Sequence, residues 1–308
     1  MTVLLIKKNI CFVPYQKRFF QYSFHVDKCN SQMQYETVIT KYYHAIEKGL
    51  AFTDYRAGFG RNNINTLIRL MEEYSQKYGV DSFCYNTSLC TLYAYVEKNR
   101  EYGLEDTELE KRIYSLPGVA NQAGGVLEFV PLNDQDCNYE YMVMGRHSIR
   151  HFSDVPVNMD ILNRALSLAQ QTPSACNRQG WRTIVVQDKN KVSDILNYQN
   201  GNAGFGYEID KLLLVVVDIQ AFNSEREVFQ PYVDGGMYAM RLLDSLCYCG
   251  IATCPLSAAL TPEQEENVRR IAELDDSEIP IIFIGIGNYP ENCQTTKSER
   301  HSPATRYI

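Results

Sequence analysis

Apolar residues in the first third of the chain recur at intervals of three and four, the spacing that predicts amphipathic helices. In one such stretch Ile64, Leu67, Ile68 and Met71 share a side, and Gly79 follows as a stop. The predicted helices span residues 35–50, 62–78, 82–102 and 105–114. The N-terminal region is therefore expected to be mostly helical.

The pattern changes after a connector predicted at residues 124–137. An amphipathic helix capped by Asn158 is followed by strands and helices in alternation. The run Leu-Leu-Leu-Val-Val-Val within 211–219 suits a central strand covered on both faces. Thr261, Pro262 and Gln264 together form a helix-start signal. The predicted elements are helices 158–171, 235–248 and 261–274 and strands 181–187, 211–219, 251–256 and 279–287.

This alternation predicts a layered α/β (α+β) domain, a sheet flanked by helices, over residues 136–308. Residues 1–135 form the helical N-terminal region that precedes it. No internal repeat or low-complexity block interrupts either part.

Composition excludes several classes of protein. The 308 residues carry a formal net charge of −7 without a stripe of lysine and arginine, so no nucleic-acid partner is expected. No stretch approaches the roughly 20 apolar residues of a membrane span, so no membrane insertion is expected. A chain of this size needs no disulfides, and its 10 cysteines indicate free thiols in a reducing cytoplasm. Cys247, Cys249 and Cys254 lack zinc spacing, so no metal site is expected.

A dense polar cluster, Arg146-His147-Ser148-Ile149-Arg150, lies just before the helix capped by Asn158. Two guanidinium groups and a hydroxyl within five residues can neutralise and hydrogen-bond a phosphate dianion. A solvated basic turn is the alternative interpretation, and the cluster alone does not decide between the two.

A second cluster, from Pro173 to Trp181, follows the same helix and has the composition of a loop. Asn177 and Gln179 each offer a donor and an acceptor, as the edge of a planar heterocycle requires. A helix C-terminal turn with local caps is the alternative interpretation here.

In this order and spacing, the two clusters resemble the opening of the nitroreductase family. That family's pattern reads roughly R-R/H-S-x-R-x-F, a helix, and then P-S-x-x-N-x-Q-P-W. Gly180 stands where the pattern has proline, which loosens the turn without removing a contacting side chain.

Later segments resemble the same family, so that the resemblance covers about residues 140–308. The helix from Asp234 is similar to its long core helix, with Gly235, Gly236 and Ala239 predicted to let another helix approach closely. The final strand with Asn288-Tyr289-Pro290 and the basic segment 297–300 match its late segments.

The resemblance implies a homodimer with one FMN at each subunit interface. Arg146, Ser148 and Arg150 would hold the phosphate, ribityl chain and pyrimidine edge, with His147 in support. From the other subunit would come Pro173, Ser174, Ala175 and Asn177, and Gln179 is counted with the cofactor contacts. The remaining expected contacts are Leu256 and Ser257 near flavin N5, Lys297 and Arg300 at the phosphate, and Asn202 at the pyrimidine ring.

The resemblance also implies an FMN-dependent oxidoreductase that uses NAD(P)H to reduce a small-molecule acceptor by ping-pong hydride transfer. Hydride chemistry belongs to the cofactor, so no catalytic side chain is expected. The alternative is a non-redox relative, the same dimer acting as an interaction or accessory protein. Two observations motivate it: Gly180, and the short spans 199–210 and 220–233, where the family often has an extra helical excursion.

Overall fold

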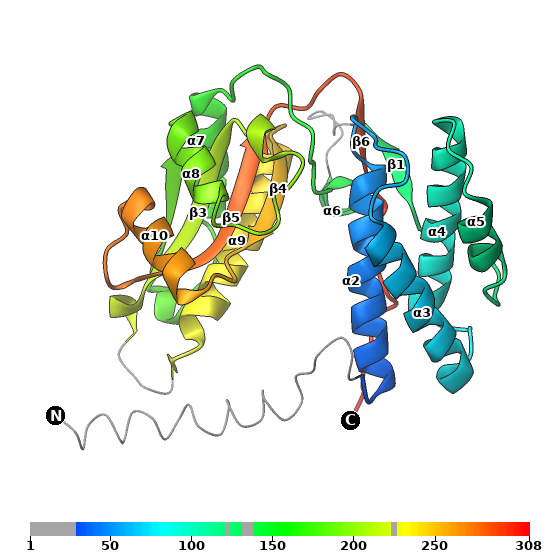
Figure 1. Ribbon diagram of the computed structural model, residues 1–308. Helices are drawn as coiled ribbons and strands as arrows, with labels where there is room; N and C mark the ends of the chain where they lie inside the picture. The colour runs from blue at the N-terminus through cyan, green and yellow to red at the C-terminus, as the bar shows by residue number, and fades with distance from the viewer. Residues whose placement is uncertain (1–28, 121–123, 131–137, 223–226) are drawn as a thin grey trace. The chain divides into compact units, whose positions relative to one another are not determined.

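The computed structural model describes residues 29–120, 124–130, 138–222 and 227–308 (Figure 1). The chain divides into two compact units. The sheet unit comprises the described residues of Phe129–Cys293. The helical unit comprises the described residues up to Glu128 together with Gln294–Ile308. It is therefore formed by two segments, one before and one after the sheet unit in the sequence.

The sheet unit is built on four antiparallel strands in the order β2-β3-β5-β4. Their bounds are β2 (Trp181–Val186), β3 (Lys211–Asp218), β4 (Ala252–Ser257) and β5 (Glu278–Gly287). Every residue of β3 except the last is buried, which confirms the predicted central strand. Pro255 lies in β4, an edge strand, where proline removes no donor that the sheet needs.

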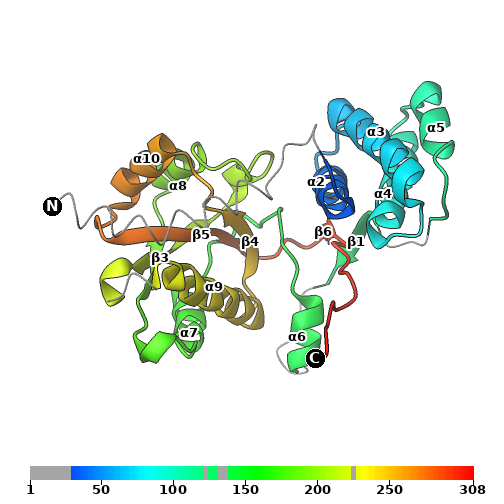
Figure 2. The same ribbon diagram turned by 90° about the horizontal axis from the view of Figure 1, so that it is seen from below.

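Helices cover both faces of this sheet (Figure 2). One face carries α7 (Met159–Ala169) and α9 (Gln230–Tyr248), and the other carries α8 (Lys189–Leu196) and α10 (Pro262–Ala272). On the first face Leu213, Val215 and Val217 of β3 join one hydrophobic core with buried residues of α7 and α9. Alternation along a strand directs the residues between them to the second face. The predicted layered arrangement of sheet and helices is confirmed.

The sequence specified the starts of α7 and α10 correctly. The Asn158 side chain accepts from the backbone N of Asp160 at 2.8 Å and caps α7. Thr261 and Gln264 form a reciprocal capping box at α10, as predicted. The sequence missed α6 (Tyr139–Gly145) and α8, and it began α9 five residues late.

The small residues of α9 have a different role from the one predicted. Gly235 faces the sheet, since an added Cβ would lie 2.8 Å from Val217 Cγ2 and 2.8 Å from Ile281 Cγ1. Ala239 is buried in the core that α9 shares with the sheet, and Gly236 has nothing within 4 Å of an added Cβ. The expectation of one small-residue face for another helix was wrong, because Gly235 lets α9 approach strands.

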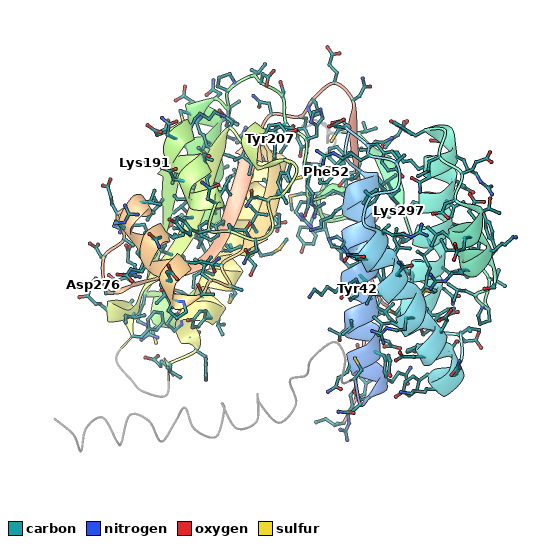
Figure 3. The ribbon with its side chains drawn as sticks, viewed as in Figure 1. Tyr42, Phe52, Lys191, Tyr207, Asp276 and Lys297 are labelled. Atoms are coloured by element: carbon teal, nitrogen blue, oxygen red, sulfur yellow. The ribbon has the colours of Figure 1, made fainter. Side chains whose placement is uncertain are left out.

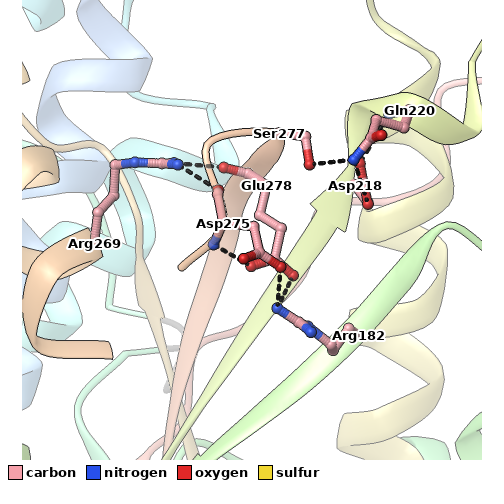
Figure 4. A network of polar contacts seen from close by, with 7 residues as sticks. All are labelled: Arg182, Asp218, Gln220, Arg269, Asp275, Ser277 and Glu278. Carbon is pink, nitrogen blue, oxygen red and sulfur yellow. Dashed lines mark hydrogen bonds and ion pairs between the residues drawn. The ribbon is translucent and has the colours of Figure 1, made fainter. Parts of the chain in front are cut away.

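A polar network joins the ends of β2, β3 and β5 to the segment after α10 (Figure 4). Glu278 is almost fully buried, pairs with Arg182 of β2, and accepts from the backbone N of Asp275 at 2.9 Å. Arg269 donates to the backbone oxygens of Asp275 and Glu278. A buried carboxylate needs such partners, so the network fixes the segment that leads into β5.

The helical unit has its own core. Buried residues of α2 (Gln32–Leu50), α3 (Arg61–Tyr78), α4 (Phe83–Glu101) and α5 (Thr107–Tyr114) form one hydrophobic cluster. The predicted helical N-terminal region is confirmed, and α3 ends before Gly79, whose φ is 80°. The predicted connector is partly wrong. Within it β1 (Val126–Phe129) pairs with β6 (Cys293–Thr296), a strand that the sequence also missed, and residues 131–137 lie outside the described residues.

Among the described residues, no helix combines the length and the apolar character needed to cross a membrane. Cys247 and Cys254 are buried and Cys249 is half-buried. No group of three or more His, Cys, Asp or Glu side chains placed to hold a metal ion occurs in the described part of the chain.

Candidate functional site

The first predicted cluster lies along the edge of the sheet. We call Arg146–Phe152 the arginine segment; it follows α6 directly. The backbone N of Ile149 donates to Thr253 O of the edge strand β4 at 2.8 Å, and Ile149 is fully buried. The three predicted contacts Arg146, Ser148 and Arg150 are all half-buried. The segment is therefore docked through Ile149, with the cationic and hydroxyl residues on either side.

Arg146 has a buried hydrogen-bond donor that no other described residue satisfies. Its Nη1 atom is buried and has no hydrogen-bond partner among the described residues, and the same holds for Oδ1 of Asp244 on α9. Burial raises the pKa of the Asp244 carboxyl, and the nearby charges of Arg146 and Arg241 oppose that shift. A buried donor without a partner costs about 1–3 kcal/mol. An acceptor from a bound anion would remove this cost, so Arg146 fits a phosphate.

The other members of the first cluster have partners nearby. Arg150 Nη1 donates weakly to Ser148 O at 3.3 Å. The His147 ring packs edge-on against Phe129, with ring centroids 5.9 Å apart. Among the described residues, neither Arg146 nor Arg150 forms an ion pair with a carboxylate. Within the described ranges neither guanidinium group is bonded to a carboxylate, although the Asp244 carboxyl lies near Arg146.

The second predicted cluster runs from Pro173 to Trp181, and its part before β2, Pro173–Gly180, is called the asparagine loop. It contains the short 3-10 helix η2 (Ala175–Asn177). Cys176 and Gln179 both lie in the left-handed region, at φ of 52° and 51°. Non-glycine residues in that region are strained, and such strain is typical of binding and catalytic sites.

Contacts from several sides hold the asparagine loop in this conformation. Asp234 of α9 is buried and accepts from the backbone N of Ala175 at 3.3 Å. Arg178 forms a two-bond pair with Glu227, at 3.0 and 2.6 Å. Sequence reasoning missed Asp234 as a site residue, although its place at the head of the core helix was a usable signal.

Ser174, Gln179 and Pro173 have different environments within the loop. The Ser174 hydroxyl accepts from the backbone N of Gln179 at 2.9 Å. Gln179 Oε1 accepts from Gln170 Nε2 at 2.9 Å, and Gln170 Oε1 accepts from Trp181 Nε1 at 3.1 Å. Pro173 is exposed. The Oε1 atom of Gln179 is therefore bonded to Gln170, and this bond helps to hold the loop.

Replacing Asp234 with alanine removes the acceptor of Ala175 N and of Gln230 Nε2, which lies 2.8 Å from Oδ1. We expect the free energy of unfolding to fall by about 1–2 kcal/mol, together with faster amide exchange in the asparagine loop. Denaturant unfolding and hydrogen exchange measure the two effects, with the exposed Asp154→Ala as the control. Unchanged exchange at Ala175 would show that Asp234 does not hold the loop.

Asn202 lies in the wall of a cavity of about 350 Å³ between α8 and the turn η3 (Gly206–Glu208). Its Nδ2 donates to Leu196 O at 2.8 Å and to Gln199 O at 2.6 Å. The amide donor thus caps the C-terminal end of α8. Tyr207, labelled in Figure 3, is 79% exposed at the same turn.

Leu256 and Ser257 form the last residues of β4, the strand on which the arginine segment docks. Leu256 is buried and Ser257 is exposed. Ser257 O accepts from Gln199 Nε2 at 3.1 Å, and its hydroxyl accepts from Ala259 N at 3.0 Å. Lys297 (labelled in Figure 3) and Arg300 belong to the helical unit, whereas all the other predicted contacts belong to the sheet unit.

The fold and these contacts define a mixed helix-and-sheet protein with a candidate anion site beside the edge strand. The family model described as "Nitroreductase family" matches residues 143–203, which span the arginine segment, α7, the asparagine loop, β2 and α8. Residues 143–203 are therefore similar to the nitroreductase family, and over these residues the resemblance identified from the two motif clusters is confirmed.

Part of this chain is similar in sequence to a known protein. Over 44 residues it is 46% identical to Spy0809 of Streptococcus pyogenes serotype M6, provisionally named an NAD(P)H nitroreductase. That stretch is 14% of this chain and 22% of the relative, so the chain matches about a fifth of this curated relative's length.

Two solved structures are also similar. One is an FMN-dependent nitroreductase from Clostridium difficile R20291, with 20% identity, 49% of this chain and 87% of that chain covered, and a TM-score of 0.43. The other is a nitroreductase family protein from Clostridium novyi NT, with 16% identity, 50% and 87% covered, and a TM-score of 0.46.

Proposed function

We propose that this protein is an FMN-dependent oxidoreductase of the nitroreductase type, which uses NAD(P)H to reduce a small-molecule acceptor. The observation that carries the proposal is the buried Nη1 of Arg146, which has no partner among the described residues. It lies within the matched family segment, four positions before a second arginine, Arg150, which forms no ion pair among the described residues. An oxygen of a bound phosphate would supply the acceptor that Nη1 lacks.

In this proposal Arg146, Ser148 and Arg150 hold the FMN phosphate, ribityl chain and pyrimidine edge, with His147 in support. When bound, FMN would supply the hydride chemistry between NAD(P)H and the acceptor in a ping-pong cycle. The protein's own contribution is to neutralise the phosphate and to fix the ring by hydrogen bonds and packing. No side chain is required as a general acid or base.

The proposal includes a homodimer, in which Pro173, Ser174, Ala175 and Asn177 reach the FMN of the second subunit. The outer side of α9 supports it, because Val233, Met237 and Met240 are 43–50% exposed there. Exposed apolar residues gathered on one helix favour a protein interface over free solvent. The asparagine loop is tied to the same helix by Asp234, so a dimer formed through α9 would carry this loop to the interface.

The test is the visible spectrum of the purified protein, followed by NADH and NADPH oxidation with a quinone or nitroaromatic acceptor. We expect a flavin spectrum, or its recovery on incubation with FMN, and acceptor-dependent oxidation of one of the two nucleotides. A protein that stays colourless after incubation with FMN would refute the proposal. FMN binding without turnover would favour the non-redox accessory protein instead.

A further inference from the structure

We propose that Glu208 is a positioning residue, which sets the arginine segment in the conformation that binds phosphate. This role rests on the FMN site proposed above and deepens it. Glu208 is the last residue of the turn η3 and follows Arg150 by 58 positions in the sequence.

The Glu208 carboxylate is bound to the arginine segment through one oxygen. Oε2 lies 2.5 Å from His151 Nδ1 and accepts from the backbone N of Phe152 at 2.9 Å. The Glu208 side chain is 15% exposed. Burial of a carboxylate is unfavourable unless it is hydrogen-bonded. The carboxylate is satisfied by two donors of this segment, so it favours the position in which both donors reach it.

Two neighbouring contacts also hold the arginine segment in place. The Phe152 ring is buried against Gly287, where an added Cβ would lie 2.6 Å from Phe152 Cδ1. Ile149 N is bound to β4, as described above. The segment is thus held at residues 149, 151 and 152, while Arg146 and Arg150 are left to meet a ligand.

The distribution of charge supports a positioning role rather than a role as counter-ion. A carboxylate that acts as counter-ion to an arginine commonly pairs with it through two parallel hydrogen bonds. Here the Glu208 carboxylate contacts His151, the residue adjacent to Arg150. Neither Arg146 nor Arg150 forms an ion pair in the described part of the chain. Glu208 therefore orders the segment without neutralising the charges that a phosphate needs.

The test replaces Glu208 with glutamine, which keeps the size of the side chain and an acceptor for Phe152 N but lacks the negative charge of the carboxylate that contacts His151. We expect the dissociation constant for FMN, measured by flavin fluorescence quenching, to rise about tenfold. The control is Glu273→Gln, which removes an exposed carboxylate paired with Lys191 on the same unit. It should leave FMN affinity unchanged.

A double-mutant cycle separates positioning from general destabilisation. If Glu208 acts through the arginines, Glu208→Gln should weaken FMN little further in an Arg150→Ala background. Equal losses in both backgrounds, or unchanged affinity in Glu208→Gln alone, would overturn the inference while leaving the FMN site intact. A wild-type protein that fails to bind FMN would overturn the proposed function, and this inference with it.

Discussion

Replacing Arg146 with alanine is expected to weaken FMN binding by about 2 kcal/mol, a rise of roughly 30-fold in the dissociation constant. The reason is the buried Nη1, which no residue in the described part of the chain satisfies. A phosphate oxygen would supply the missing acceptor, and the bond would be charge-assisted on both sides. Titration of the apoprotein with FMN, followed by fluorescence quenching, measures the change.

The Arg146→Ala protein should fold as well as the parent, because the deletion removes an unsatisfied buried donor rather than a bonded one. A matched control is Arg270→Ala, since Arg270 is exposed on α10 and its guanidinium bonds Asn267. That variant should keep parental FMN affinity. Unchanged affinity in Arg146→Ala would remove Arg146 from the cofactor site.

Replacing Leu213 with alanine should lower the free energy of unfolding of the sheet unit by about 3–4 kcal/mol. Leu213 is fully buried in the central strand and belongs to the core shared with α7 and α9. Removing its side chain forfeits transfer free energy and leaves a cavity that a packed sheet cannot close. Urea unfolding followed by circular dichroism measures the loss.

The control for Leu213 is Leu168→Ala, because Leu168 lies on α7 of the same unit and is 39% exposed. Leu168→Ala should lower the free energy of unfolding by less than about 1 kcal/mol. Equal effects of the two substitutions would mean that β3 is not the centre of the cooperative core.

The sequence predicted elements well where a local signal was strong. The apolar run of β3, the Asn158 cap and the Thr261 capping box all lie where they were predicted. Each signal is contained within a few residues and acts through local hydrogen bonds or burial. Weak local signals failed: β1 and β6 are four residues each, and their pairing joins segments more than 150 residues apart.

Residues of the candidate site were also named from the sequence where the signal was local and missed where their contacts depend on distant residues. The sequence named Arg146, Ser148, Arg150 and the asparagine loop from a motif and its spacing, and the family match covers those residues. It missed Asp234 and Glu208, because their hydrogen bonds join residues 56 to 59 positions apart. It also named Asn202 and Gln179 as cofactor contacts, which stays a prediction. In the structure Asn202 Nδ2 donates to Leu196 O at the end of α8, and Gln179 Oε1 accepts from Gln170.

By itself, the sequence determined the helical N-terminal region, the central strand and the order of the chemical groups along the chain. Only the tertiary structure decided that Gly235 faces strands, that a buried donor of Arg146 meets no partner within the described ranges, and that Glu208 binds the arginine segment. The reason is physical. Periodicity and caps are set by neighbours in sequence, whereas burial and hydrogen-bond satisfaction depend on which distant segments pack together.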